Sequence, residues 1–144
     1  MLESLRPSSN QFQVGQFRLS LGRPLLMGII NISPDSFFDG GKYIKPKAAI
    51  DYAAKLLSEG VDILDIGGES SRPGAVPVPY EEERRRVLPV LKEILKFNVP
   101  VSVDTYKPSL MKEVLEEGAS MINDIYGFRM PGALRTVSEF NAGI

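Results

Sequence analysis

Short apolar runs alternate with amphipathic segments along most of the chain. The runs have the length and the β-branched content of buried strands, and they are PLLMGII (24–30), VDILDIGG (61–68), VPVSVD (99–104) and ASMINDI (119–125). The segments between them repeat apolar residues at helical spacing, which predicts helices over residues 45–59, 80–97, 107–118 and 131–140. The pattern therefore predicts four β-α units in succession.

Features at the boundaries refine this prediction. Residues 11–22 alternate apolar and polar side chains around Gly15, which predicts a short β-hairpin before the first unit. Pro89 lies within the second predicted helix, which is expected to kink or to begin anew there because proline lacks a backbone donor. Residues 142–144 resemble the beginning of a fifth strand.

Alternating strands and helices favour an α/β fold with a parallel sheet covered by helices, either an open doubly wound sheet or a (β/α)₈ barrel, the TIM barrel. An open sheet usually has a glycine-rich phosphate turn directly after its first strand, and no such turn follows residues 24–30. The barrel fits better, because polar residues follow each strand, namely Asn31, Glu69, Asp104 and Asn123. A closed barrel needs about 250 residues, so 144 residues supply the first four βα units, with residues 1–23 as a hairpin segment and 24–144 as the half-barrel.

Composition narrows the chemistry. The chain is 43% hydrophobic and 24% charged, as in a globular domain, and its net charge of −1 gives no reason to expect nucleic-acid binding. The arginines at 84–86 follow three glutamates at 81–83, so this stretch is expected to be the solvated face of a helix. No apolar run approaches about 18 residues and no leader sequence is evident, which predicts a cytoplasmic protein without a membrane anchor.

The chain contains neither cysteine nor histidine. Thiolate nucleophiles, imidazole bases and Cys- or His-ligated metals are therefore excluded within it. Any metal ion would be a hard cation on oxygen ligands, with Mg²⁺ as the first candidate. Asn31 and, less certainly, Asp35 are the candidate ligands, although an Asn or Asp after a strand can also simply form a turn.

The other candidate site residues also follow strands. Asp104 and Asn123 together offer acceptors and donors to a ring with N–H and C=O edges. A buried Asp104 needs a partner, either a ligand or a neighbour such as Lys107. Arg72, beside Ser71, can clamp an anion, or it can be an exposed loop residue paired with Glu69. Asp65, inside a strand, is expected to be structural and bonded to backbone or to a loop.

Four motifs resemble one known family. NISPDSFFDGGKY after MGI, DIGGESSRPGA, VSVDT and the IND of MINDIYG are similar to the dihydropteroate synthases of folate biosynthesis, in family order and spacing over most of residues 25–129. The resemblance implies a TIM barrel and a transferase that joins 6-hydroxymethyl-7,8-dihydropterin pyrophosphate to p-aminobenzoate, with release of pyrophosphate. It also implies Mg²⁺ as cofactor and sulfonamides as competitors of p-aminobenzoate.

The resemblance also implies roles for individual residues. Asn31, assisted by Asp35, would bind the metal and the pyrophosphate, and Asp104 and Asn123 would bind the pterin. Ser71 and Arg72 would belong to a loop that frames the p-aminobenzoate and pyrophosphate sites. Asn31, Arg72 and Asp104 are thus the expected catalytic residues.

The family's second half, with further pterin and pyrophosphate ligands, has no counterpart among these 144 residues. A second half-barrel is therefore the expected partner, as a further region of the same protein, a separate chain or another copy, and the 144-residue chain alone is expected to be incomplete for catalysis. Two alternatives stay open: a pterin-dependent methyltransferase barrel, and a non-catalytic half-barrel that serves as a binding or assembly module.

Overall fold

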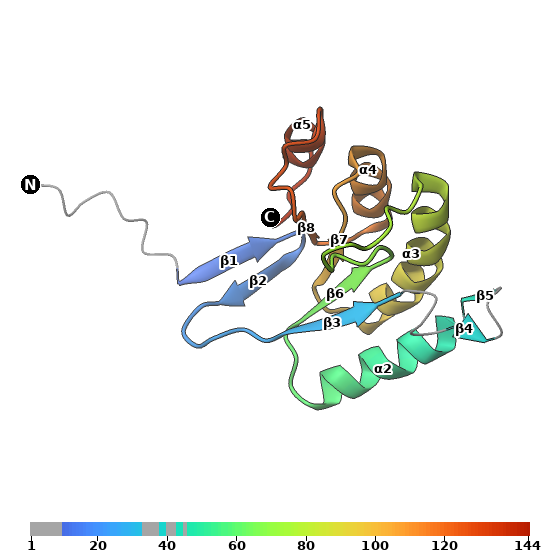
Figure 1. Ribbon diagram of the computed structural model, residues 1–144. Helices are drawn as coiled ribbons and strands as arrows, with labels where there is room; N and C mark the ends of the chain where they lie inside the picture. Colours follow the sequence, from blue (N-terminus) through green and yellow to red (C-terminus); the bar gives the residue numbers. More distant parts are fainter. Residues whose placement is uncertain (1–9, 33–37, 40–42, 45) are drawn as a thin grey trace, which may run out of the picture.

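A parallel sheet forms the centre of the computed structural model, which describes residues 10–32, 38–39, 43–44 and 46–144 (Figure 1). The sheet has the order β3-β6-β7-β8, so that each strand pairs with the next one along the chain. Its strands are β3 (Met27–Asn31), β6 (Ile63–Gly67), β7 (Val101–Asp104) and β8 (Met121–Asn123). This order is that of consecutive βα units in a barrel, as predicted.

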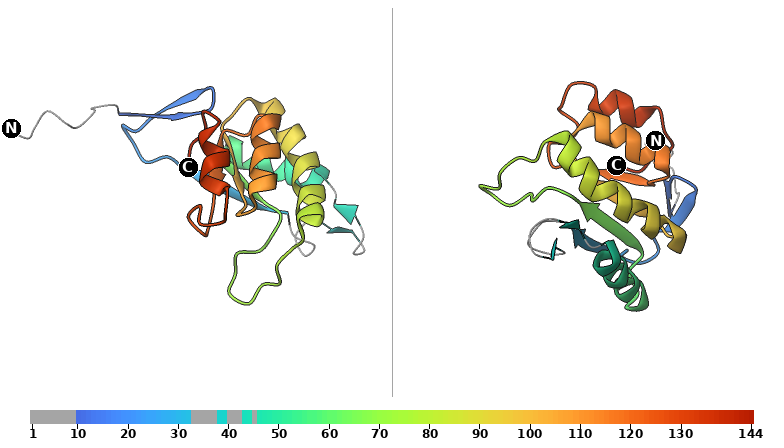
Figure 2. Two further views of the ribbon diagram at one scale, coloured as in Figure 1. Left: turned by 90° about the horizontal axis from the view of Figure 1, so that it is seen from above. Right: turned by 90° about the vertical axis from the view of Figure 1, so that its right-hand side faces the viewer.

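Helices follow the strands and cover one face of the sheet (Figures 1 and 2). They are α2 (Pro46–Ser58), α3 (Tyr80–Ile94) with the 3₁₀ turn η1 (Leu95–Phe97), α4 (Pro108–Glu117) and α5 (Ala133–Ser138). Consecutive helices pack against each other. The expectation that the second helix begins anew near Pro89 is wrong, because α3 continues through this residue.

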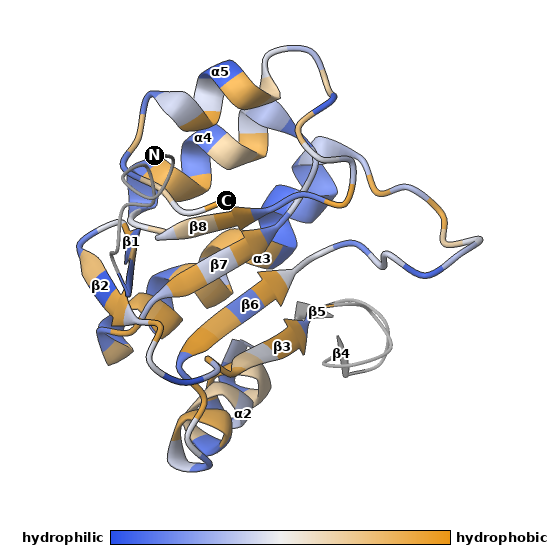
Figure 3. Cartoon of the chain, turned by 90° about the vertical axis from the view of Figure 1, so that its left-hand side faces the viewer, coloured by the Kyte–Doolittle hydropathy of each residue, from blue (hydrophilic) through white to orange (hydrophobic). Residues whose placement is uncertain are grey.

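The two faces of the sheet differ in what covers them: the helices pack on one face, whereas the other face is exposed along β3 and buried at Ile63, Asp65 and Ser102. Every second residue along the strands faces the helices and belongs to the hydrophobic core. These residues are Ile30, Leu64, Ile66, Val101, Val103 and Ile122. On the opposite face, Met27 and Ile29 are 40% and 59% exposed. Figure 3 shows the hydrophobic strands of this sheet side by side. The described sheet thus corresponds to part of a barrel wall, and its inner face is exposed along β3.

The predicted hairpin is confirmed. Strands β1 (Gln11–Val14) and β2 (Phe17–Ser20) pair antiparallel, and Gly15 adopts a φ of +57°, which suits a tight turn of this kind. Val14 packs with Ile63 and Met121, near the N-terminal ends of their strands. A second pair, β4 (Phe38–Asp39) and β5 (Tyr43–Ile44), was not predicted from the sequence.

The beginning of a fifth parallel strand is also present. Gly143 forms a parallel bridge with Met121, in which Gly143 N donates to Ser120 O (2.9 Å) and Ile122 N donates to Gly143 O (3.0 Å). Glycine is required at this position, because a Cβ there would lie 2.6 Å from Val14 Cγ1. The chain therefore continues the barrel order past β8.

Candidate functional site

The register of the sheet aligns one row of residues at the C-terminal ends of the strands. Asn31 pairs with Gly67, Gly67 with Asp104, and Asp104 with Asn123. Aligned residues of neighbouring strands point to the same face. Asn31, Asp104 and Asn123 therefore all lie on the inner face of the barrel wall, at its rim.

Asp104 is half-buried, and none of the described residues forms a hydrogen bond with its carboxylate. Burial, together with the nearby carboxylates of Asp65, Glu83, Asp124 and Glu69, raises the pKa of Asp104 to about 7. Gly67 leaves space for this side chain, since a Cβ on Gly67 would lie 3.3 Å from Asp104 Cβ. Within the described part of the chain this carboxylate therefore has no hydrogen-bond partner, and an N–H donor or a positive charge would satisfy it.

Lys107 is not the partner of Asp104 that the sequence suggested as one alternative. Its Nζ instead forms ion pairs with Glu69 Oε2 (2.7 Å) and Glu83 Oε2 (2.5 Å). The positive charge of Lys107 is therefore shared between two other carboxylates, which leaves Asp104 in a locally negative environment.

Asp65 corrects a second expectation, because its partner is neither backbone nor a loop. It is 3% exposed, and its Oδ2 accepts a hydrogen bond from Asn123 Nδ2 (3.2 Å). Burial raises the pKa of Asp65, although Ser102 and Asn123 oppose this. Asp65 Oδ1 and Ser102 Oγ lack a hydrogen bond of acceptable geometry. The sequence held a usable signal: Asp65 lies two residues before Gly67, so it shares the inner face.

The inner face also carries an open hollow of about 330 Å³. It is lined by Met27, Ser102, Met121, Ile122, Asn123, Asp124, Phe128 and Ile144. A hollow lined mainly by apolar side chains with a few polar groups is typical of sites for small organic ligands.

The loop between β6 and α3 extends beyond the strand ends (Figure 2). Ser71 lines a small hollow together with Asp104, Thr105 and Tyr106, whereas Arg72 is exposed and does not line it. The alternative of an Arg72–Glu69 pair is wrong, because Glu69 pairs with Lys107. The structure therefore brings Ser71 to Asp104 but leaves Arg72 facing solvent.

Asn31 is exposed at the rim, whereas Asp35 lies outside the described residues. No group of three or more Asp or Glu residues in the described part of the chain could hold a metal ion. Mg²⁺ commonly keeps several waters and binds through one or two protein oxygens together with substrate phosphates. The amide oxygen of Asn31 is compatible with that mode of binding, and a site made entirely of protein ligands is not present among the described residues.

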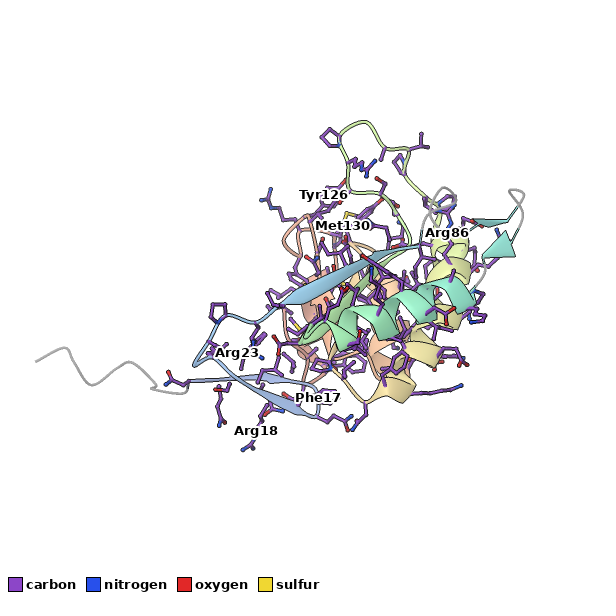
Figure 4. All side chains as sticks on the ribbon, turned by 90° about the horizontal axis from the view of Figure 1, so that it is seen from below. Phe17, Arg18, Arg23, Arg86, Tyr126 and Met130 are labelled. Carbon is purple, nitrogen blue, oxygen red and sulfur yellow. The ribbon has the colours of Figure 1, made fainter. Side chains whose placement is uncertain are left out.

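The charged stretch at 81–86 is not wholly solvated, which corrects another expectation. Glu83 is 1% exposed and Arg86 is 9% exposed, and Arg86 Nη1 donates to Gly68 O (2.8 Å; Figure 4 labels Arg86 on α3). Gly68 allows α3 to approach this closely, because a Cβ there would lie 2.9 Å from Val87 Cγ2. The first turns of α3 are thus fixed directly beneath the site.

The raised pKa of Asp104 predicts an unusual dependence of stability on pH. Between its ordinary pKa of 3.8 and about 7, the folded chain retains a proton that the unfolded chain releases, so the free energy of unfolding falls as the pH rises through this window. We expect Asp104→Asn to remove this contribution and to stabilise the unliganded chain by about 2–4 kcal/mol at pH 7.5 and very little at pH 4.

Urea denaturation of both proteins across this pH range measures the difference. Subtracting the two curves isolates Asp104 from carboxylates such as Asp62 and Glu113, whose pKa values lie below normal and whose effect on stability has the opposite sign. A difference that does not change with pH would contradict the raised pKa.

Comparisons with known proteins agree with this geometry. The model of the family described as "Pterin binding enzyme" matches residues 27–144. The chain is 48% identical over 124 residues to the dihydropteroate synthase of Bacillus subtilis (85% of this chain, 44% of that protein) and 46% identical over 122 residues to that of Escherichia coli K12 (84% and 43%). It spans less than half the length of these curated relatives.

Solved structures give the same picture. Burkholderia cenocepacia dihydropteroate synthase complexed with 7,8-dihydropteroate has a TM-score of 0.83 at 47% identity (92% of this chain, 44% of that chain). Xanthomonas albilineans dihydropteroate synthase with 4-aminobenzoic acid has a TM-score of 0.85 at 47% identity (92% and 49%). The Yersinia pestis enzyme, solved as a sulfonamide drug complex, has a TM-score of 0.81 at 42% identity (90% and 47%). In the described part of this chain, no helix has the length and apolarity to cross a membrane.

Proposed function

The chain belongs to the pterin-binding enzyme family, and from this premise we propose that it supplies the first four βα units of a dihydropteroate synthase. The reaction joins 6-hydroxymethyl-7,8-dihydropterin pyrophosphate to p-aminobenzoate. The observation that carries the proposal is the half-buried carboxylate of Asp104, which none of the described residues hydrogen-bonds and which is aligned with Asn123 and Asn31 at the strand ends.

Asp104 and Asn123 bind the pterin in this proposal. The carboxylate accepts hydrogen bonds from ring N–H groups, which relieves the cost of burying it without a partner. Asn123 already donates one hydrogen of its amide to Asp65. This bond orients the amide, so that its oxygen and its second hydrogen are available to the ligand.

The chemistry needs no protein nucleophile. The C–O bond to pyrophosphate breaks, its electron pair leaves with the pyrophosphate, and the amine nitrogen of p-aminobenzoate bonds to the exposed methylene carbon and loses a proton. The negative charge of Asp104 and its acidic neighbours favours the positive charge that develops on the pterin methylene. A chain without cysteine or histidine is compatible with this reaction.

The pyrophosphate requires positive charge. Asn31, with Asp35, would supply oxygen ligands to Mg²⁺, which when bound neutralises charge on the leaving group. Arg72 and Ser71 would act from their loop, with the exposed guanidinium free to turn towards an anion. Structures of related enzymes with 7,8-dihydropteroate, with 4-aminobenzoic acid and with a sulfonamide drug support both ends of the reaction. A cytoplasmic location stays a prediction.

A second half-barrel completes the site in this proposal. The exposed Met27 and Ile29 on the inner face are apolar residues that a closed barrel would bury. The chain spans only 44% of the length of the Bacillus subtilis relative, which also supports a second half-barrel. The alternative of a non-catalytic binding module uses the same exposed face but gives no role to the raised pKa of Asp104.

Complementation tests the proposal. The chain is purified alone and together with the carboxy-terminal region of the Bacillus subtilis enzyme, and dihydropteroate formation is measured with Mg²⁺. We expect little or no turnover from the chain alone and clear turnover from the mixture. Full activity of the isolated chain would contradict its incompleteness. Absence of turnover in a mixture that forms a stable complex would contradict the assigned reaction, and binding of methyl-tetrahydrofolate in place of the pterin pyrophosphate would favour the methyltransferase alternative.

A further inference from the structure

Glu69 joins the two ends of the loop between β6 and α3. Its Oε2 accepts a hydrogen bond from the backbone N–H of Val78 (2.9 Å), nine residues later in the chain. The other hydrogen bonds within this loop span only two or three residues, from Arg72 N to Ser70 Oγ and from Ala75 N to Arg72 O. Three of its residues are prolines, which have no N–H to donate. Among the hydrogen bonds within this loop, only the one between Glu69 and Val78 therefore joins its two ends.

Lys107 fixes Glu69 from the neighbouring β7–α4 connection. The ion pair between Lys107 Nζ and Glu69 Oε2 is 2.7 Å long, and the same Nζ contacts the buried Glu83 and lies 4.3 Å from the centre of the Tyr106 ring. The side chains of Glu69 and Lys107 are only 12% and 16% exposed. Burial alone would raise the pKa of Glu69, but hydrogen bonds from Lys107 and from Val78 N–H hold it below its usual value.

This anchor lies beside the candidate site. Glu69 lines the same small hollow as Ser71 and Asp104, and only one residue separates Glu69 from Ser71. Lys107 follows Asp104 by three residues, at the start of α4. A change in the position of Glu69 would therefore shift the β6–α3 loop relative to Asp104.

We propose that Glu69 is a positioning residue that, through Lys107 and the N–H of Val78, holds the loop of residues 70–77 above Asp104 and so places Ser71 and Arg72 for the second substrate. This inference rests on the proposed function only for the identity of that substrate. Glu69 acts through the loop and does not itself contact the reacting atoms. Its removal should weaken binding of p-aminobenzoate more than it slows the chemical step.

Two variants and a control separate positioning from general stability. Glu69→Ala removes both contacts, whereas Glu69→Gln keeps an acceptor for Val78 but loses the charge that pairs with Lys107. Glu81→Ala is the matched control, because Glu81 is an exposed glutamate in the first turn of α3. Amide hydrogen exchange is followed by NMR in the 144-residue chain, and KM and kcat are measured in the mixture with the carboxy-terminal half.

We expect the Val78 amide to exchange at least ~10-fold faster in Glu69→Ala, a loss equivalent to one hydrogen bond to a charged group, with amides of β7 and α4 unchanged. The KM for p-aminobenzoate should rise by about tenfold with a smaller fall in kcat, and Glu69→Gln should lie between this variant and the wild type. Unchanged exchange at Val78, faster exchange spread evenly over β6, β7 and α4, or an unchanged KM would each overturn the proposal. If the wild-type mixture shows no turnover, the assigned reaction fails, and the exchange of Val78 still decides whether Glu69 closes the loop.

Discussion

Replacing Lys107 with methionine is expected to lower the free energy of unfolding by about 3–5 kcal/mol, because it leaves the buried carboxylate of Glu83 and the partly buried carboxylate of Glu69 without their counterion. Glu83 is 1% exposed and Glu69 12% exposed, and both contact Lys107 Nζ. Methionine conserves most of the side-chain volume, so the loss would report the charge and not a cavity. Urea denaturation at pH 7 measures the change.

Lys112→Met provides the matched control for this prediction. Lys112 lies on α4, its side chain is 59% exposed, and it forms a 3.9 Å ion pair with Glu116. Exposed pairs of this kind contribute about 0–1 kcal/mol. Adding Glu83→Gln to Lys107→Met should recover part of the loss, because it removes one of the two unpaired charges. Equal stability of the Lys107→Met and Lys112→Met variants would show that the buried charge cluster does not support the fold.

Asp104→Asn is expected to reduce dihydropteroate formation by about 10²- to 10³-fold in the two-part enzyme, the effect of losing one preorganised electrostatic group. The amide keeps the shape of the side chain but loses the negative charge that accepts ring N–H groups and favours a developing cation. The same variant is expected to stabilise the unliganded chain at pH 7.5, as argued above from the raised pKa of Asp104. A gain in stability with a loss of turnover is typical of a residue retained for function.

Steady-state kinetics of the mixture test this prediction, with Asp51→Asn on the surface of α2 as the control. Asp51 forms an exposed pair with Lys47 and lines neither of the hollows at the strand ends. We expect the control to keep wild-type turnover. Wild-type turnover in Asp104→Asn as well would favour the reading of the chain as a non-catalytic module.

The fold and the row of strand-end residues could be predicted from the sequence because both depend on local rules. Apolar runs separated by amphipathic segments fix the order of strands and helices. In a parallel sheet, successive strands end at the same edge. Asn31, Asp104 and Asn123 each follow or end such a run, so their alignment required no knowledge of side-chain packing.

The contacts of the charged residues Glu69, Glu83, Arg86 and Lys107 could not be predicted in the same way. Three glutamates followed by three arginines are typical of a solvated helix, and the identity of the contacts of Glu83 and Arg86 depends on how closely α3 approaches Gly68. A partial signal existed. Glu83 lies four residues before the buried Val87, and Arg86 lies four residues before the buried Val90, so both charged residues fall on the buried face of α3. Pairing of Lys107 with Glu69 joins residues 38 positions apart and follows only from the packed structure.

A crystal structure of the two-part enzyme with 6-hydroxymethyl-7,8-dihydropterin pyrophosphate will show whether the strand-end side chains of this chain converge on one flat heterocycle. We predict that one edge of the pterin lies within about 2.7–3.2 Å of both the Asp104 carboxylate and the Asn123 amide, with the pyrophosphate towards Asn31. A pterin that binds without contact to Asp104 or Asn123 would contradict the account.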